Sequence, residues 1–291
     1  MIPEDHALSL GATMGREAVS KYINSRDLLL AVGTELSPRE IRSIDLPTNL
    51  IQIDLDYQNF GKTHPTELGI VADAGEAFRE LTSSVEERSV RFNDEREAVA
   101  ELRTELAEDE SERDDRHRIL ATLREVIDSD CVIVNDMTKL CYEPTEALPV
   151  YEPDTFLFPR GYGTLGFSPP VAYGAAIGLP NQQVVSLVGD GGFLFTVQDL
   201  ATAIKYNLGV RIVVLNDDCY GVIHDTQVRD YDGRTIGTDI DNPDFVALAR
   251  AFGAAAERID INEVENALPI ALDKAFARDR PLSKYRSTSD P

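Results

Sequence analysis

The chain has 291 residues, of which 43% are hydrophobic, so one large or two ordinary domains with buried cores are expected. Its 51 acidic and 28 basic residues give a net charge of −23, which argues against nucleic acid as a partner because the phosphate backbone would be repelled. No segment approaches the roughly 20 apolar residues of a membrane helix, and the first six residues lack the basic and apolar regions of a signal peptide. We therefore expect a cytoplasmic protein without membrane contact.

The excess acidic charge is spread along the chain and does not form one tail, which disfavours a single basic partner. Lys is scarce relative to Arg, and a strongly acidic surface suits a protein that stays in solution at high salt, where screening is strong. We expect a halophilic source. The three cysteines, Cys131, Cys141 and Cys219, are too few and too unevenly spaced for a disulfide framework or a zinc site.

In chain order, the first 82 residues contain two short apolar runs, at 27–34 and 51–56. Residues 83–118 are dense in Glu, Asp and Arg with sparse apolar positions, which predicts a solvated helical linker without a function of its own. A further apolar run, 132–138, predicts a strand that is followed by Thr138.

The segment 183–192 is the most informative part of the chain. Residues 183–188 form a short apolar run rich in β-branched residues, typical of a parallel strand covered on both faces. The glycines that follow predict a sharp turn with close approach of the backbone to a ligand. Residues 196–206 have apolar positions at helical spacing, and 210–215 form a second strand. The pattern predicts a β-turn-α-β unit.

Two acidic residues end these neighbouring strands. Asp190 and Asp217 lie 27 residues apart, and both are expected beyond the carboxyl ends of the strands, where ligands bind to open parallel sheets. Two hard oxygen ligands suit Mg²⁺, which shares its coordination shell with substrate phosphates. The amides of Gly191 and Gly192 add donors for an anion. The sequence therefore predicts a metal-bridged diphosphate.

The pattern Gly-Asp-Gly at 189–191, followed by Asn216 and Asp217, resembles the cofactor signature of thiamine diphosphate-dependent enzymes, in particular the acetolactate synthase, benzoylformate decarboxylase and pyruvate oxidase relatives. Further matches occur in the right order, at 161–170 and 242–253, and the resemblance covers nearly the whole chain. It implies an α/β fold, with a doubly wound parallel sheet that binds the diphosphate at 119–291. A partial Rossmann-like central domain at 1–82 and the charged linker at 83–118 would precede it.

The resemblance also assigns site residues. It implies that Asp190 is the first metal ligand, that Asp217 is the second at a position where the family often has Asn, and that the main-chain carbonyl of Cys219 is the third. Leu165 resembles the bulky aliphatic residue that bends the cofactor. The other expected cofactor contacts are Thr138, Gly163, Thr164, Gly189, Gly191 and Gly192. The alternatives are that Asp217 and Thr138 only cap turns and that Leu165 only fills the core.

A carboxylate from a separate pyrimidine-binding domain, normally first in the chain, activates the cofactor in this family, so no catalytic residue is assigned here. We expect an amino-terminally truncated enzyme or one half of a split enzyme, which would obtain that domain from another chain in a homo- or hetero-oligomer. The resemblance implies decarboxylation of a 2-oxo acid with thiamine diphosphate and Mg²⁺, and flavin binding is not supported. The alternatives are an inactive cofactor-binding remnant and, more weakly, an Mg²⁺ site for unrelated phosphoryl chemistry.

Two further features complete the sequence interpretation. His224 follows the second strand towards the expected substrate side, but an exposed loop histidine is favoured over a catalytic one. Residues 280–291 become polar soon after Pro281, so the final strand of the family pattern is expected to be weak or lost. Together with the abrupt start, this raises the alternative of a degraded gene.

Overall fold

The computed structural model describes residues 2–37, 46–47, 49–85, 92–108, 114–142, 147–159 and 161–277. They fall into two compact units, Ile2–Glu110 and Ser111–Pro291, which are considered separately. The prediction for residues 280–291 lies outside the described part of the chain. In the described ranges, no helix combines the length and the apolar character needed to cross a bilayer.

The first unit contains a three-stranded parallel sheet in the order β1-β2-β3. Leu50 and Ile53 on the central strand are fully buried, and Ala31 and Leu36 pack with Leu50 in a small core. Its elements are α1 (Glu17–Asn24), β1 (Leu29–Val32), β2 (Leu50–Asp54), η1 (Tyr57–Asn59), β3 (Leu68–Val71), α3 (Ala74–Ser84) and α4 (Phe92–Glu108).

Helix α4 lies within the segment that the sequence predicts to be a solvated linker. Two of its apolar side chains, Val99 and Leu102, are buried, and Tyr22 on α1 donates a hydrogen bond of 2.7 Å to Glu95 Oε2. Arg103 donates to the main-chain carbonyls of residues 4 and 6. This helix therefore contributes to the core of the first unit, while its many charged residues remain on the exposed side.

The second unit contains a four-stranded parallel sheet in the order β5-β4-β6-β7. The predicted α/β class with parallel sheets is confirmed, and the predicted strand at 210–215 is β7. The elements are α5 (Asp115–Val126), β4 (Val132–Asn135), η3 (Lys139–Tyr142), β5 (Phe156–Leu157), α6 (Ser168–Gly178), β6 (Val184–Gly189), α7 (Asp190–Thr196), η5 (Val197–Asp199), α8 (Leu200–Lys205), β7 (Val210–Leu215), α9 (Gly221–Asp230), α10 (Phe245–Ala251), η6 (Ile261–Glu263) and α11 (Val264–Phe276).

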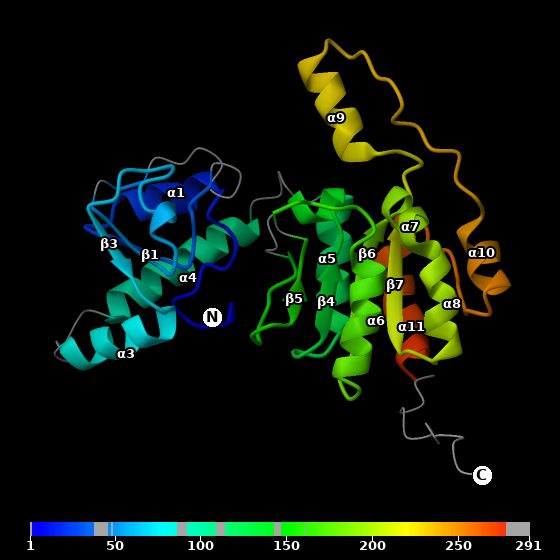
Figure 1. Cartoon of the computed structure of the whole chain (residues 1–291), viewed down its shortest axis with the longest axis horizontal. Helices are drawn as coiled ribbons and strands as arrows, with labels where there is room; N and C mark the ends of the chain where they lie inside the picture. Colours follow the sequence, from blue (N-terminus) through cyan, green and yellow to red (C-terminus); the bar gives the residue numbers. More distant parts are fainter. Residues whose placement is uncertain are drawn as a thin grey trace. The chain divides into compact units, whose positions relative to one another are not determined.

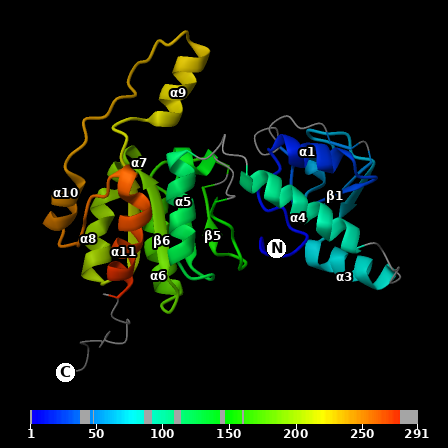
Figure 2. The ribbon, with the colours of Figure 1, turned by 180° about the vertical axis from the view of Figure 1, so that it is seen from behind.

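Helices cover both faces of this sheet, and the strand residues alternate between the two covering layers. Ile133, Val185 and Leu187 pack against α5 and α11, which lie in front of the sheet in Figure 2. Their neighbours Val134 and Val184 pack against α6 on the opposite face. Because both faces of the sheet are buried, the sequences of β4 and β6 are nearly continuous apolar runs.

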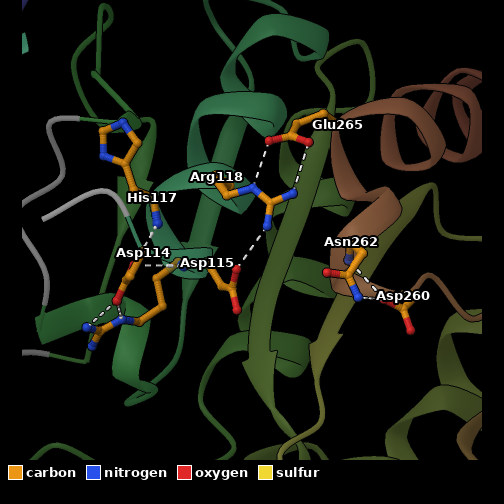
Figure 3. Close-up of polar contacts among 8 residues, drawn as sticks. Asp114, Asp115, His117, Arg118, Asp260, Asn262 and Glu265 are labelled. Carbon is orange, nitrogen blue, oxygen red and sulfur yellow. Dashed lines mark hydrogen bonds and ion pairs between the residues drawn. The ribbon is translucent and has the colours of Figure 1, made fainter. Parts of the chain in front are cut away.

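A polar contact also joins the two helices of one layer. Arg118 on α5 donates hydrogen bonds of 2.7 Å and 3.0 Å to the two carboxylate oxygens of Glu265 on α11, and it pairs with Asp115 one turn away (Figure 3). The pair lies on the exposed side of a helix contact whose centre is Leu123 and Leu272, both buried. The apolar contact therefore stabilises this layer, and the exposed ion pair adds little to it.

The strand order places a change of direction at the centre of the sheet. The connection from β4 leads to β5 on one side, whereas β6 and β7 lie on the other side. In open parallel sheets, ligands bind at such a switch point, beyond the carboxyl ends of the strands. Here those ends are the residues that follow Asn135 on β4 and Gly189 on β6.

The predicted sharp turn after β6 is wrong. Asp190 is the first residue of α7, and neither Gly191 nor Gly192 has a positive φ, so both adopt ordinary helical backbone. The glycines are required for space instead. A Cβ atom at Gly191 would overlap the ring of Tyr220, and one at Gly192 would lie 3.1 Å from Asp136 Oδ1. Their small size lets other segments approach the start of α7.

Candidate functional site

Asp136 lies directly after β4 at the switch point and is completely buried. Its carboxylate accepts hydrogen bonds from three main-chain N–H groups, those of Met137 at 2.9 Å, Gly166 at 3.1 Å and Ser168 at 2.8 Å. Burial raises the pKa of Asp136 above its usual value, and these hydrogen bonds oppose the rise. One side chain thus fixes the loop before α6 to the tip of β4.

The same loop packs on α7. Gly166 has φ +77°, and a Cβ atom there would lie 3.0 Å from Phe195 Cβ and 3.2 Å from the carbonyl oxygen of Gly192. Ser168, which begins α6, attaches the loop to the central strands: its hydroxyl donates to the Val134 carbonyl on β4 at 2.6 Å and lies 2.7 Å from Ser186 Oγ on β6. The two sequence motifs at 161–168 and 189–192 therefore form one structural unit at the carboxyl edge of the sheet.

Asp190 is 2% exposed and lies at the centre of a cluster of oxygen atoms. Its Oδ1 accepts the amide of Gly191 at 2.7 Å, so this amide is engaged within the chain. Its Oδ2 lies 2.7 Å from Asn242 Nδ2, which is also 2.8 Å from Asn216 Oδ1 and 2.9 Å from Asp218 Oδ1. An amide nitrogen has only two hydrogens for these three acceptors. The oxygens thus converge on a position that suits a cation.

Asp217 faces a different neighbour. Its Oδ2 lies 3.7 Å from the ammonium nitrogen of Lys139, which also pairs with Asp225 at 3.0 Å. Burial raises the pKa of Asp217, the charge of Asp190 raises it further, and Lys139 opposes both effects. Asp190 therefore acts on Asp217 electrostatically, although the two carboxylates point to different partners.

In the segment after β7, Asp218 adopts a left-handed backbone conformation with φ +53°. Cys219 then forms an isolated antiparallel bridge with Asp239, flanked by hydrogen bonds from Tyr220 N to Thr238 O and from Ile240 N to Asp218 O. In such a pair the N–H and C=O of the central residue point away from the partner segment. The carbonyl of Cys219 is thus directed away from 238–240, which is compatible with its predicted role as a ligand.

The donor set fits a hard divalent cation. Carboxylate, amide and main-chain oxygens are the ligands that Mg²⁺ prefers, and the buried Oδ1 of Asn242 has no hydrogen-bond partner within the chain. No group of three or more His, Cys, Asp or Glu side chains that could hold a metal occurs among the described residues. A metal here would need mixed ligands, including a main-chain carbonyl, together with oxygens from a bound anion.

The remaining predicted residues lie around this edge in different environments. Thr138 is buried and its Oγ1 accepts the amide of Leu140 at 3.1 Å, so it caps η3. Leu165 and Gly163 are half-buried, and Thr164 is exposed. His224 lies on α9, where its Nδ1 is 3.3 Å from Asp225 Oδ1. Figure 1 shows α9 beyond the tips of the central strands, at the same end as α7.

Several residues of this region are absent from the sequence prediction, among them Asp136, Lys139 and Asn242. A signal for the first exists, because an acidic residue directly after an apolar strand lies at the same edge as Asp190. Lys139 and Asn242 come close to the acids only through the order of the strands and the path of the 231–244 segment. Spacing along the chain does not encode that proximity.

The comparison with family models matches two adjoining domains. Residues 136–283 match the "Thiamine pyrophosphate enzyme, C-terminal TPP binding domain", and residues 1–81 match the "Thiamine pyrophosphate enzyme, central domain". The first match includes every residue of the candidate site.

Curated relatives give the same result. The chain is 34% identical over 274 residues to a probable 2-ketoarginine decarboxylase of Pseudomonas aeruginosa, covering 92% of this chain and 49% of the relative. It is 31% identical to a probable acetolactate synthase large subunit of Methanocaldococcus jannaschii (88% and 46% covered). It is 27% identical to the acetolactate synthase isozyme 1 large subunit of Escherichia coli (90% and 48%). The chain thus spans about half the length of these relatives.

Proposed function

The chain belongs to the thiamine pyrophosphate enzyme family, and on this basis we propose that its second unit binds the diphosphate of thiamine diphosphate through Mg²⁺. Asp190, Asp217 and the carbonyl of Cys219 are the proposed protein ligands. The surroundings of Asp190 carry the proposal, because its buried Oδ2 gathers with oxygens of Asn216 and Asp218 around the Asn242 nitrogen, beside the start of α7. Asp217 and the Cys219 carbonyl are included because the family resemblance implies them.

The cofactor would supply a carbon nucleophile for attack on the carbonyl group of a 2-oxo acid. The chain's own residues would bind and orient it. The loop held by Asp136 carries Gly163, Thr164 and Leu165, and its attachment to α7 would keep the pyrimidine contacts at a fixed position relative to the diphosphate site. Holding the cofactor in one orientation would favour catalysis, because the reacting groups are then already in position.

We propose that decarboxylation of a 2-oxo acid requires a pyrimidine-binding domain in addition to the two domains that these 291 residues match. Two of the relatives support the reaction class by their names, as a decarboxylase of a 2-oxo acid and as a synthase large subunit. The activating carboxylate would come from that domain, as it does in the family.

Thermal stabilisation tests binding. Thiamine diphosphate and Mg²⁺ at about 100 times the dissociation constant are expected to stabilise the wild-type chain by about 2.7 kcal/mol. Removal of the metal with a chelator, or the substitution Asp190→Ala, is expected to abolish this shift, because the carboxylate that bridges metal and protein is lost. The melting temperature is measured for each variant with and without ligand, so a lower starting stability does not obscure the result.

Asp128→Ala is the matched control, because Asp128 is exposed and lies before β4, at the opposite end of that strand. It should retain the full shift. A shift that persists in Asp190→Ala would contradict the metal site. As a second readout, addition of a pyrimidine-binding domain should start decarboxylation of 2-oxo acids by wild type and not by Asp190→Ala. Binding without any such activity would indicate a cofactor-binding protein without turnover.

A further inference from the structure

Lys139 joins three elements of the second unit through one ammonium group. The residue follows β4, and its Nζ lies 3.7 Å from Asp217 Oδ2 after β7 and 3.0 Å from Asp225 Oδ2 on α9. The side chain is 34% exposed, so its interactions are only partly screened by solvent. This cation is therefore held at the edge of the proposed diphosphate site.

Gly221 provides the space that this arrangement needs. A Cβ atom at position 221 would overlap Lys139 Cε and would lie 2.7 Å from Lys139 Nζ and 2.8 Å from Asp217 Oδ2. The backbone of Gly221 does not have a positive φ, so its conformation does not require glycine. The absence of a side chain instead lets the ammonium group reach Asp217.

The charge at Asp217 explains why a cation is useful here. A neutral Asn at this position would also offer an oxygen to a metal. An Asp adds a negative charge to the edge of the sheet that already carries Asp190. A diphosphate is itself anionic, so the additional carboxylate would repel the ligand unless a nearby cation offsets it.

Building on the proposed function, we infer that Lys139 is a positioning residue that compensates the charge of Asp217 and so permits an aspartate at the second metal-ligand position. The ammonium group, 3.7 Å from Asp217 Oδ2, would offset the repulsion between this carboxylate and the diphosphate. The inference predicts that the effect of Lys139 on cofactor binding depends on whether residue 217 carries a charge.

A double-mutant cycle tests this dependence. The binding of thiamine diphosphate in saturating Mg²⁺ is measured by titration calorimetry for wild type, Lys139→Met, Asp217→Asn and the double variant. Lys139→Met is expected to weaken binding about tenfold, which corresponds to about 1.4 kcal/mol. Asp217→Asn should change binding little, and the double variant should bind within about threefold of Asp217→Asn. An equal loss on both backgrounds would overturn the inference.

The affinity for Mg²⁺ in the absence of the cofactor separates charge compensation from a merely structural role of Lys139. Because an ammonium group repels a dication, Lys139→Met should bind Mg²⁺ at least as tightly as wild type while it binds the diphosphate more weakly. Weaker binding of Mg²⁺ alone would contradict compensation and indicate a damaged site. Lys139→Arg keeps the charge and should restore cofactor binding. Lys139→Gln serves as the neutral variant if Lys139→Met does not fold.

Lys205→Met is the matched control, since Lys205 lies on α8 with its ammonium group over the ring of Tyr206, and its loss changes the net charge by the same amount. It should bind the cofactor as wild type does. If the wild-type protein binds the cofactor and Lys139→Met binds it equally well, only this inference is overturned. Wild-type protein that does not bind the cofactor with Mg²⁺ would overturn the proposed function and this inference together.

Discussion

Asp136 shows how a single residue organises the candidate site. Its buried carboxylate gathers three main-chain N–H groups that would otherwise lie unsatisfied beside the central strands. Buried polar groups without partners cost about 1–3 kcal/mol each. The carboxylate thus fixes the loop that precedes α6, and Gly192 leaves the room that its oxygen atoms occupy.

Asp136→Ala is accordingly expected to lower the free energy of unfolding by roughly 3 kcal/mol, because three N–H groups, two of them buried, lose their acceptor. Urea denaturation of the second unit measures this loss. Asp128→Ala, at an exposed position, should change stability by less than about 0.5 kcal/mol. Equal stabilities of the two variants would show that the loop is held by other contacts.

The pH dependence of stability tests the environment of Asp136 independently. Because burial raises the pKa of Asp136, the folded state retains a proton at pH values where the unfolded chain has already lost it. The stability contributed by this group therefore falls as pH rises from the usual carboxyl range through the raised pKa. The stability difference between wild type and Asp136→Ala should narrow over that interval, and a difference that widens would contradict the assignment.

At the scale of elements, the second unit depends on two helices that pack on the same face of its sheet. Leu123 on α5 is fully buried, and it belongs to the same core cluster as Leu268 and Leu272 on α11 and Val185 on β6. Helical spacing brings Leu120 and Leu123 of α5, together with Ile127 directly after it, to the same cluster. This layer supports the strands whose tips carry the site.

Leu123→Ala is expected to lower the free energy of unfolding by about 2–5 kcal/mol, because it removes buried methyl groups and leaves a cavity. Leu179→Ala, in which the same chemical change occurs at a side chain that is 43% exposed, is the matched control and should have a much smaller effect. Chemical denaturation measures both. A loss below about 1 kcal/mol at Leu123 would mean that the core closes around the missing side chain.

At the scale of the whole molecule, charge is the dominant property. A net charge of −23 on 291 residues produces self-repulsion that opposes the compact state. Ion pairs such as Arg118 with Glu265 offset only a small part of it, since the acidic residues outnumber the basic ones almost two to one. Dissolved salt can screen the remainder.

The melting temperature should therefore rise with KCl, mainly between about 0.1 M and 1 M, where the Debye length falls from about 10 Å to 3 Å. Differential scanning calorimetry over this range measures the effect. A rise that begins only above 1 M would reflect exclusion of the salt from the protein surface. A melting temperature that is constant or falls below 1 M would contradict the proposal that the acidic surface is suited to high salt.

The sequence by itself determined the parallel α/β class, the strand β7 and the family, because apolar runs and a short glycine and acid motif are local properties of the chain. It did not predict that Asp190 begins a helix, because two adjacent glycines usually indicate a turn. Here glycine is needed for a different reason, since Tyr220 and Asp136 approach these positions from elsewhere in the chain. It also did not identify the roles of Asp136, Lys139 and Asn242.

Only the tertiary structure decided which residues meet at the site. The strand order brings the end of β4 beside the end of β6, and the return of the chain after α9 places Asn242 against Asp190. The contact between Asp190 and Asn242, which are 52 positions apart, depends on the packing of whole elements, which no local pattern specifies. The chemistry of the motif was therefore readable in the sequence, whereas its charge balance and support depended on the fold.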